Sequence, residues 1–421
     1  MALSQASRAL WFHTEFLKLW IGQSISSFGT AITTLALPLT AVVFLHATPS
    51  QMGILSAALT LPALLMSLFF GVWIDRMRRR PVLIAADLGR MVLLGLIPLA
   101  AWLGLLHIEE MYIIGLFVGV LTVLFDIAIT SFLPSVVSQK GLVEGNSKLQ
   151  QSGYFMAIVG PGAAGALIGL ITAPMAILVD AFSYLVSVIS LWLIRTPEPP
   201  LQHPVSAHRS VWKEIGEGLH ALWQTPVLRD MIIFTAIGAF FGTLQQTVFV
   251  LFIINELKLT SLQFGLLASV SGVASLMGAL LVSRIARRLG PGPTIILGQG
   301  FAGLGGVLLA VAGGPPALAL FLLISGQIAS GLGTPLYSVN QIALRQAMTP
   351  GHLLGRVNAS RRFLVFGIMP LAALLSGVLG STLGLRPTLI MGASGLLVAF
   401  CWVFFSSIRQ VRAFPHVAES N

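Results

Sequence analysis

The sequence predicts an all-α membrane protein with twelve transmembrane helices in two six-helix halves. Of its 421 residues, 56% are hydrophobic and only 9% are charged, whereas a soluble domain carries about a quarter charged residues. Apolar runs long enough to cross a bilayer as helices recur along the chain. Basic residues gather in alternate connections between these runs. A chain with so few charges cannot cover a water-facing surface, so lipid must surround most of it.

Runs of about 20 apolar residues define the predicted spans. In order, they cover residues 18–45, 51–74, 82–105, 112–137, 149–172, 174–194, 231–254, 262–283, 293–313, 316–342, 358–381 and 387–408. The first 20 residues include Arg8, Glu15 and Lys18, and no small-residue cleavage site precedes a short apolar core. We therefore expect no removable signal peptide, and a first span that is retained.

The distribution of basic residues predicts the topology. If the N-terminus is cytoplasmic, alternate loops also face the cytoplasm. These loops begin at Asp75, Ser138, Arg195, Ser283 and Ala343. All but two of the 24 Lys and Arg residues, Lys258 and Arg386, then fall on the cytoplasmic side. This asymmetry predicts cytoplasmic termini and a plasma-membrane location. A basic inner surface beside anionic lipid accounts for the net charge of +10, so we expect membrane lipids and no nucleic acid as partners.

One long polar connection divides six spans from six. It opens with the proline-rich TPEPP and continues as SVWKEIGEGLHALWQTP, which favours an amphipathic helix on the inner surface. The predicted domains are residues 1–195, a cytoplasmic linker 196–230, and residues 231–421. The loop after span 8 repeats the glycine and the arginines of the loop after span 2, with Ser283 in place of the acid. Such correspondence between halves is typical of secondary transporters.

The loop GVWIDRMRRRP, residues 71–81, joins spans 2 and 3. Gly71 and Asp75 lie one helical turn apart, so the glycine permits close helix approach while the carboxylate can accept hydrogen bonds from arginines or a helix N-terminus. A solvated basic turn that only fixes topology is the alternative. The spacing resembles the loop between helices 2 and 3 of the major facilitator superfamily, which implies a conformational-switch loop. The matching residues are Gly71, Asp75, Arg76, Arg79 and Arg80, while Arg78 replaces the second glycine of the pattern.

Span 5 contains GYFMAIVGPGAAGALIG. Gly160, Pro161 and Gly165 match the span-5 motif of facilitator-type antiporters, with Ala164 replacing one glycine. The alternative is a kinked helix that serves packing only. A further segment with Gly355, Arg356 and Asn358 resembles the inner loop before helix 11 in the macrolide- and siderophore-efflux branch of the superfamily. That branch often has an acid after the span-1 glycine, but here Gly29 is followed by Thr30.

Asp126 and Asp180 are the acids predicted to lie deep in the membrane. A charge at the centre of a span costs roughly 2.5–3.5 kcal/mol, so a retained carboxylate needs a partner, a cavity or a function. We expect no Lys, Arg or His near the middle of any span. Asp87 and Arg90 lie at the start of span 3, close enough to the cytoplasm to pair with the Asp75 loop. Asp126 and Asp180 are therefore the proton-coupling candidates. Two alternatives are a neutral acid bonded to hydroxyls, and a partner for a cationic substrate.

Polar side chains scattered through apolar spans predict a central cavity for a lipophilic or amphipathic solute. The substrate-cavity candidates are Gln23, Thr30, Gln245, Gln246, Gln327 and Asn340. We expect no buried basic residue that could hold a phosphate or carboxylate. The resemblance implies a proton-coupled antiporter that expels drug-like compounds, and we expect it to be a monomer. A dedicated exporter of a siderophore or natural product is the main alternative, and an importer is the third.

Other function classes find little support in the sequence. The eight His residues fall in predicted loops, tails or the linker, which disfavours an intramembrane metal site. No GxxxxGK[ST] loop is present for ATP. Cys401 is the only cysteine and has no predicted catalytic partner. We therefore expect no enzyme and no cofactor, with a membrane-embedded enzyme or a non-transporting sensor as the remaining alternative.

Overall fold

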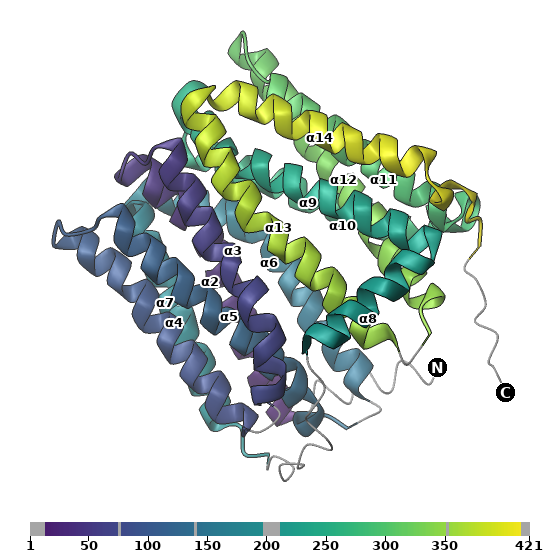
Figure 1. Ribbon diagram of the computed structural model, residues 1–421. Helices are drawn as coiled ribbons and strands as arrows, with labels where there is room; N and C mark the ends of the chain where they lie inside the picture. The colour runs from purple at the N-terminus through teal and green to yellow at the C-terminus, as the bar shows by residue number, and fades with distance from the viewer. Residues whose placement is uncertain (1–12, 75–76, 139–140, 197–210, 351–352, 414–421) are drawn as a thin grey trace. The chain divides into compact units, whose positions relative to one another are not determined.

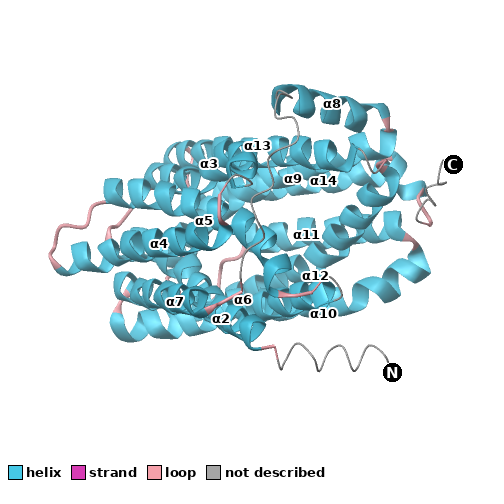
Figure 2. Ribbon diagram, turned by 90° about the horizontal axis from the view of Figure 1, so that it is seen from below, coloured by secondary structure: helices cyan, strands magenta, loops and turns pink. Residues whose placement is uncertain are grey.

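The computed structural model describes residues 13–74, 77–138, 141–196, 211–350 and 353–413, without the side chains of residues 67–74 and 211–215. The described chain is helical and contains no strand (Figures 1 and 2). Twelve of its helices are long and apolar enough to cross a membrane, which confirms the predicted spans.

The first half of the chain forms six long helices. They are α2 (Thr14–Leu39), α3 (Pro49–Ile74), α4 (Arg79–Trp102), α5 (Ile108–Val136), α6 (Leu142–Ile171) and α7 (Ala173–Leu193). The short helix α8 (Val211–Gln224) follows in the polar connection. The second half comprises α9 (Pro226–Leu251), α10 (Ser261–Leu289), α11 (Pro291–Val311), α12 (Pro316–Met348), α13 (Leu354–Thr382) and α14 (Leu385–Phe405).

Two compact units divide the chain. Unit 1 comprises Met1–Ala47, Ala58–Ala207 and Thr260–Ser269. Unit 2 comprises Thr48–Ala57, His208–Leu259 and Val270–Asn421. The first turns of α3 thus belong to unit 2, and those of α10 to unit 1. In unit 1, α7 packs on α2 and α4, around fully buried side chains such as Phe16, Leu83 and Phe132. In unit 2, α11 packs on α12 and α14, and α13 packs on α8 and α9.

A repeated turn marks the two halves of the sequence. α2 ends in a π-helical turn, Thr40–Phe44, and α9 ends in another, Phe252–Glu256. A leucine follows each turn, and the residue after that leucine has a positive φ. These residues are His46 and Lys258. Each connection then closes with a Thr-x-x-Gln cap, in which the glutamine side chain accepts a hydrogen bond from the threonine N–H. The same local hydrogen bonding at corresponding points indicates an internal repeat.

Glycines permit a close helix crossing within each unit. In unit 1, a Cβ on Gly165 of α6 would lie 2.6 Å from the carbonyl oxygen of Ser261 in α10. In unit 2, a Cβ on Gly53 of α3 would lie 2.7 Å from the carbonyl oxygen of Ala373 in α13. Neither space admits a side chain, so backbone meets backbone at both crossings, as small residues allow in membranes.

Candidate functional site: a buried carboxylate–arginine cluster

Asp180 lies in the interior of unit 1. It belongs to α7, and its side chain is 0% exposed. The hydroxyl of Ser183, one turn later, donates to Oδ1 at 3.0 Å and to the Asp180 carbonyl at 2.8 Å. The other oxygen, Oδ2, has no hydrogen bond of normal geometry with a described residue, and the Thr33 hydroxyl of α2 interacts with the carboxylate. One carboxylate oxygen is thus fixed by its own helix.

Close approach of α2 positions this carboxylate. A Cβ on Gly29 would stand 2.6 Å from Asp180 Oδ1 and 2.7 Å from Ser183 Cβ. Only a residue without a side chain leaves room for the carboxylate at this place. The span-1 glycine of the sequence pattern therefore packs directly against the deep acid of span 6.

Arg90 supplies a buried cation within a span, where the sequence predicts none. Its side chain is 5% exposed and lies about half-way along α4. It forms a short ion pair with Asp87, whose side chain is 0% exposed. The guanidinium carbon lies 4.3 Å from the ring centroids of both Phe125 and Tyr184. The expectation that spans contain no central base, and that Asp87 and Arg90 serve the cytoplasmic end, is therefore wrong.

We name Asp87, Arg90 and Asp180 the carboxylate–arginine cluster. The charge of Arg90 acts on both carboxylates, but its direct ion pair is with Asp87. With both acids ionised, the cluster carries one negative charge in excess; with one proton added, it is neutral. Because an uncompensated charge is costly away from water, the cluster has a physical reason to bind a proton.

Two predicted cavity residues border the cluster. Thr30 and the Tyr184 hydroxyl share a hydrogen bond of 3.1 Å. Gln23 donates to the Ser187 hydroxyl at 3.3 Å, and Ser187 in turn meets Asp87. These polar groups connect α2 with the ring and the carboxylate that contact Arg90. Thr30 follows Gly29 at the position where the related branch often carries an acid, so a hydroxyl stands there and the acid comes from α7.

The remaining polar candidates lie elsewhere. Asp126 is exposed on α5, beside the buried Phe125 that covers Arg90, and is not part of the cluster. Gln245 is buried in unit 2, where its amide donates to the Gly306 carbonyl at 2.8 Å. The buried Asn340 donates to the Leu336 carbonyl of its own helix at 2.9 Å. Gln246 is exposed and Gln327 is half-buried.

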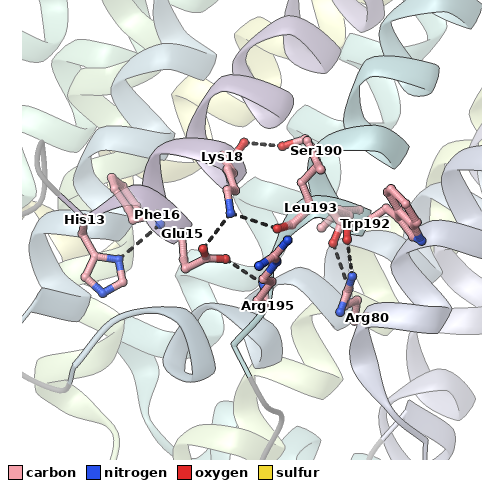
Figure 3. Close-up of polar contacts among 10 residues, drawn as sticks. His13, Glu15, Phe16, Lys18, Arg80, Ser190, Trp192, Leu193 and Arg195 are labelled. Carbon is pink, nitrogen blue, oxygen red and sulfur yellow. Dashed lines mark hydrogen bonds and ion pairs between the residues drawn. The ribbon is translucent and has the colours of Figure 1, made fainter.

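Basic side chains hold the C-terminal end of α7 (Figure 3). Arg80, from the predicted switch loop, donates to the Leu191 carbonyl at 2.8 Å and to the Trp192 carbonyl. Lys18 of α2 donates to the Leu193 carbonyl at 2.9 Å and to Glu15 at 2.7 Å. Cations at a helix C-terminus satisfy open carbonyls and complement the helix dipole. These contacts tie α2, α4 and α7 together at one end of unit 1.

The rest of the switch-loop motif is only partly described. Gly71 lies in the last turn of α3, and Arg79 begins α4. The predictions for Asp75 and Arg76 fall outside the described residues.

The span-5 motif lies at a tight contact of α6. A Cβ on Gly160 would overlap with the side chain of Ala31 on α2, and the Pro161 carbonyl abuts Gly265 on α10. The Gly162 N–H donates to the Ser269 hydroxyl at 2.9 Å. The motif glycines therefore pack α6 between two helices of unit 1.

The predicted inner loop before helix 11 is instead the start of α13, which begins at Leu354, and it carries an ion pair. Arg356 Nη1 lies 2.8 Å from Glu217 Oε2 on α8, and Gly218 of α8 meets the Arg356 carbonyl. Gly355 faces open space, and Asn358 is half-buried. In the described residues, no group of three or more His, Cys, Asp or Glu side chains is placed to hold a metal ion.

The family profile of the Major Facilitator Superfamily matches residues 19–372. The chain belongs to the major facilitator superfamily. It is a multi-pass plasma-membrane transporter, and the resemblance to the macrolide-efflux branch is confirmed by curated relatives. The multidrug efflux pump Tap of Mycolicibacterium fortuitum is 26% identical over 400 residues, covering 91% of this chain and 93% of Tap. Macrolide efflux protein A of Streptococcus pyogenes is 22% identical over 401 residues, covering 94% and 96%.

Solved structures confirm the superfamily fold. The nucleoside transporter NupG aligns with a TM-score of 0.72 at 16% identity, over 93% of this chain and 100% of NupG. A bacterial homologue of the iron transporter ferroportin, in its inward-facing state, gives a TM-score of 0.74 at 17% identity, over 93% and 98% of the two chains. At these identities the likeness concerns the fold.

Proposed function

We propose that this transporter exports lipophilic or amphipathic drug-like compounds in exchange for protons, with Asp180 as the proton carrier. The export of such compounds is supported by the names of relatives that match along most of the chain, a multidrug efflux pump and a macrolide efflux protein. The proton step rests on one observation: Asp180 is buried in a cluster where two carboxylates share one arginine.

The cluster assigns different tasks to its two acids. Asp87 pairs directly with Arg90 and remains ionised as its counter-ion. Asp180 has no ion pair within the described chain, and its Oδ2 has no hydrogen bond of normal geometry with a described residue, so this carboxylate takes up the proton. Alternating access exposes a site of this kind to each side of the membrane in turn. Water arriving from the low-proton side removes the proton and leaves the extra negative charge, which the next proton or a cationic substrate group neutralises.

Asp180→Asn tests this assignment in proteoliposomes with an imposed pH gradient. The amide keeps the size and the Ser183 hydrogen bond but cannot titrate. We expect gradient-driven transport of a macrolide and of a lipophilic dye to fall by about tenfold or more, as for removal of an essential proton-transfer group, while substrate exchange without a gradient persists. Glu109→Gln, an exposed acid in the first turn of α5, is the control and should retain gradient-driven transport. Asp126→Asn, at the other proton-coupling candidate, is measured in the same assay. Full coupling in Asp180→Asn would remove the proposal.

Substrate class is tested in cells that lack other pumps. Accumulation of dyes, macrolides and siderophores is measured with and without a protonophore. Reduced accumulation of several unrelated lipophilic compounds, abolished by the protonophore, is the expected result. Export of a single siderophore would instead identify the dedicated exporter.

A further inference from the structure

Unit 2 places a buried arginine beside a half-buried one. Arg345, near the end of α12, is 6% exposed, and Arg361, in the second turn of α13, is half-buried. Both line one small cavity with Gln341. Their charges lie close enough to repel each other. Neither arginine belongs to the carboxylate–arginine cluster of unit 1, and neither has a role in the proposed proton exchange.

The guanidinium groups have open donors. Arg345 Nε and Nη1 and Arg361 Nε are buried without a hydrogen-bond partner in the described chain. No ion pair within the described residues involves either arginine. An arginine cannot relieve burial by losing its proton under ordinary conditions. A buried cation without a counter-charge is costly, and two adjacent ones cost more. The site therefore requires an anion.

The neighbouring acids are committed elsewhere. Glu217 of α8 pairs with Arg356 at 2.8 Å. Asp230 of α9 accepts hydrogen bonds from the Ser407 N–H at 3.1 Å and the Ser407 hydroxyl at 2.7 Å. Helices α12 and α13 contain no acidic residue. The side chain of Glu214 lies outside the described residues. None of the acids described around the cavity reaches the arginine pair.

The cavity limits the size of the missing anion. Its volume is about 10 Å³, and apolar side chains from α8 and α9, including Leu222, Leu228 and Met231, form the other walls. Such a space holds roughly one water-sized particle. A phosphate group or a carboxylate-bearing drug is too large. From this geometry we infer that the Arg345–Arg361 cavity binds a single small inorganic anion of chloride size.

The anion would lie among four elements. It is held by cations of α12 and α13 and enclosed by side chains of α9 and of α8, the helix of the connection between the two sequence halves. The anion supplies the counter-charge that Asp87 supplies to Arg90 in unit 1. Loss of the anion leaves the arginines repelling each other at the place where α8 packs on α13.

Thermal unfolding of the purified full-length protein in detergent tests this site. Sodium chloride, bromide, gluconate and phosphate are compared at equal ionic strength, with and without phosphatidylglycerol. We expect chloride and bromide to raise the Tm by about 2 °C or more relative to gluconate, because an anion bound only by the folded state stabilises that state. In crystals grown with bromide, anomalous scattering should place the ion between Arg345 and Arg361.

Two variants connect the response to the cavity. Gln341→Glu places a fixed carboxylate beside Arg345 without changing side-chain size, so it should raise the Tm in gluconate and abolish the halide response. Arg345→Gln should abolish the response as well. Arg409→Gln removes a cation outside this cavity and should keep it. If Arg345→Gln does not fold, Gln341→Glu still decides.

Three results would overturn the inference. They are no halide response in the native protein, a halide response that persists in Gln341→Glu, and stabilisation by phosphate or phosphatidylglycerol but not by halides. The last result would assign the arginines to a phosphate group, free or in a lipid headgroup according to which of the two stabilises.

Discussion

Unit 1 buries Arg90 with two carboxylates, whereas unit 2 buries Arg345 beside Arg361 and leaves both without an acid in the described chain. The units share the turn at the end of α2 and α9 and a glycine crossing. The net charge of their buried ionisable side chains, however, has opposite sign. In unit 1 the excess is negative and can be removed by a proton. In unit 2 it is positive and fixed, because arginine keeps its proton. The repeat thus supplies one titratable half and one half that needs a resident anion.

Arg90→Gln should have the largest effect on folding. Removing the cation leaves Asp87 and Asp180 buried without compensation, and breaking a buried ion pair in this way costs about 3–5 kcal/mol. We expect a large fall in Tm and in the yield of monodisperse protein, measured by thermal unfolding and size-exclusion chromatography.

The double variant Asp87→Asn, Arg90→Gln is the control for this result. It removes the whole ion pair, so it should be more stable than Arg90→Gln alone. Equal loss in the single and double variants would mean that stacking of Arg90 on Phe125 and Tyr184, and not its charge, stabilises unit 1. Arg345→Gln, measured in gluconate, supplies the contrast between the units. This variant removes an uncompensated positive charge from unit 2, so we expect no fall in its Tm.

Much of the fold could be predicted from sequence, because crossing a bilayer dictates the length and composition of each helix. The charged cluster could not be predicted as readily. Asp87 and Arg90 are three residues apart and share a helix face, which was a usable signal. Their position near the start of the predicted span 3 instead indicates a pair close to the cytoplasm. The approach of Asp180 from α7 is a tertiary contact that no local pattern contains.

Arg345 shows a related difficulty. The predicted span 10 ends at residue 342, which places Arg345 in a loop. In the structure α12 continues to Met348, and the side chains of α8 and α9 cover that last turn. Hydropathy marks where a helix leaves the lipid, but it does not mark where protein continues to bury it. The repeated Thr-x-x-Gln caps were visible in the sequence and would have supported the internal repeat.

The two glycine crossings test whether the units are equivalent in packing. Gly165→Leu in α6 and Gly53→Leu in α3 each force a side chain against a facing carbonyl. Overpacking of this kind costs about 1–3 kcal/mol, and we expect similar falls in Tm for both.

Gly169→Leu is the matched control for these crossings. It lies one turn from Gly165 on the same helix, with nothing within 4 Å of its added Cβ, and should be close to neutral. If one crossing variant is tolerated and the other is not, the two crossings differ in rigidity, and the two halves of the repeat do not pack in an equivalent way.

The smallest effect is expected at the exposed ion pair of unit 2. Glu217 and Arg356 have side-chain exposures of 37% and 25%, against 0% and 5% for Asp87 and Arg90. Water screens the Glu217–Arg356 pair, so Glu217→Gln should cost about 1 kcal/mol or less.

The measurement is the Tm in sodium gluconate, where halide binding does not contribute. The difference from the native protein should vanish as the gluconate concentration rises toward about 1 M, because added salt screens an exposed pair. A loss above about 2 kcal/mol that is insensitive to salt would mean that this pair is desolvated when α8 docks on α13. In that case unit 2 would contain a compensated ion pair beside its uncompensated arginines, and the contrast in buried charge between the two units would be reduced.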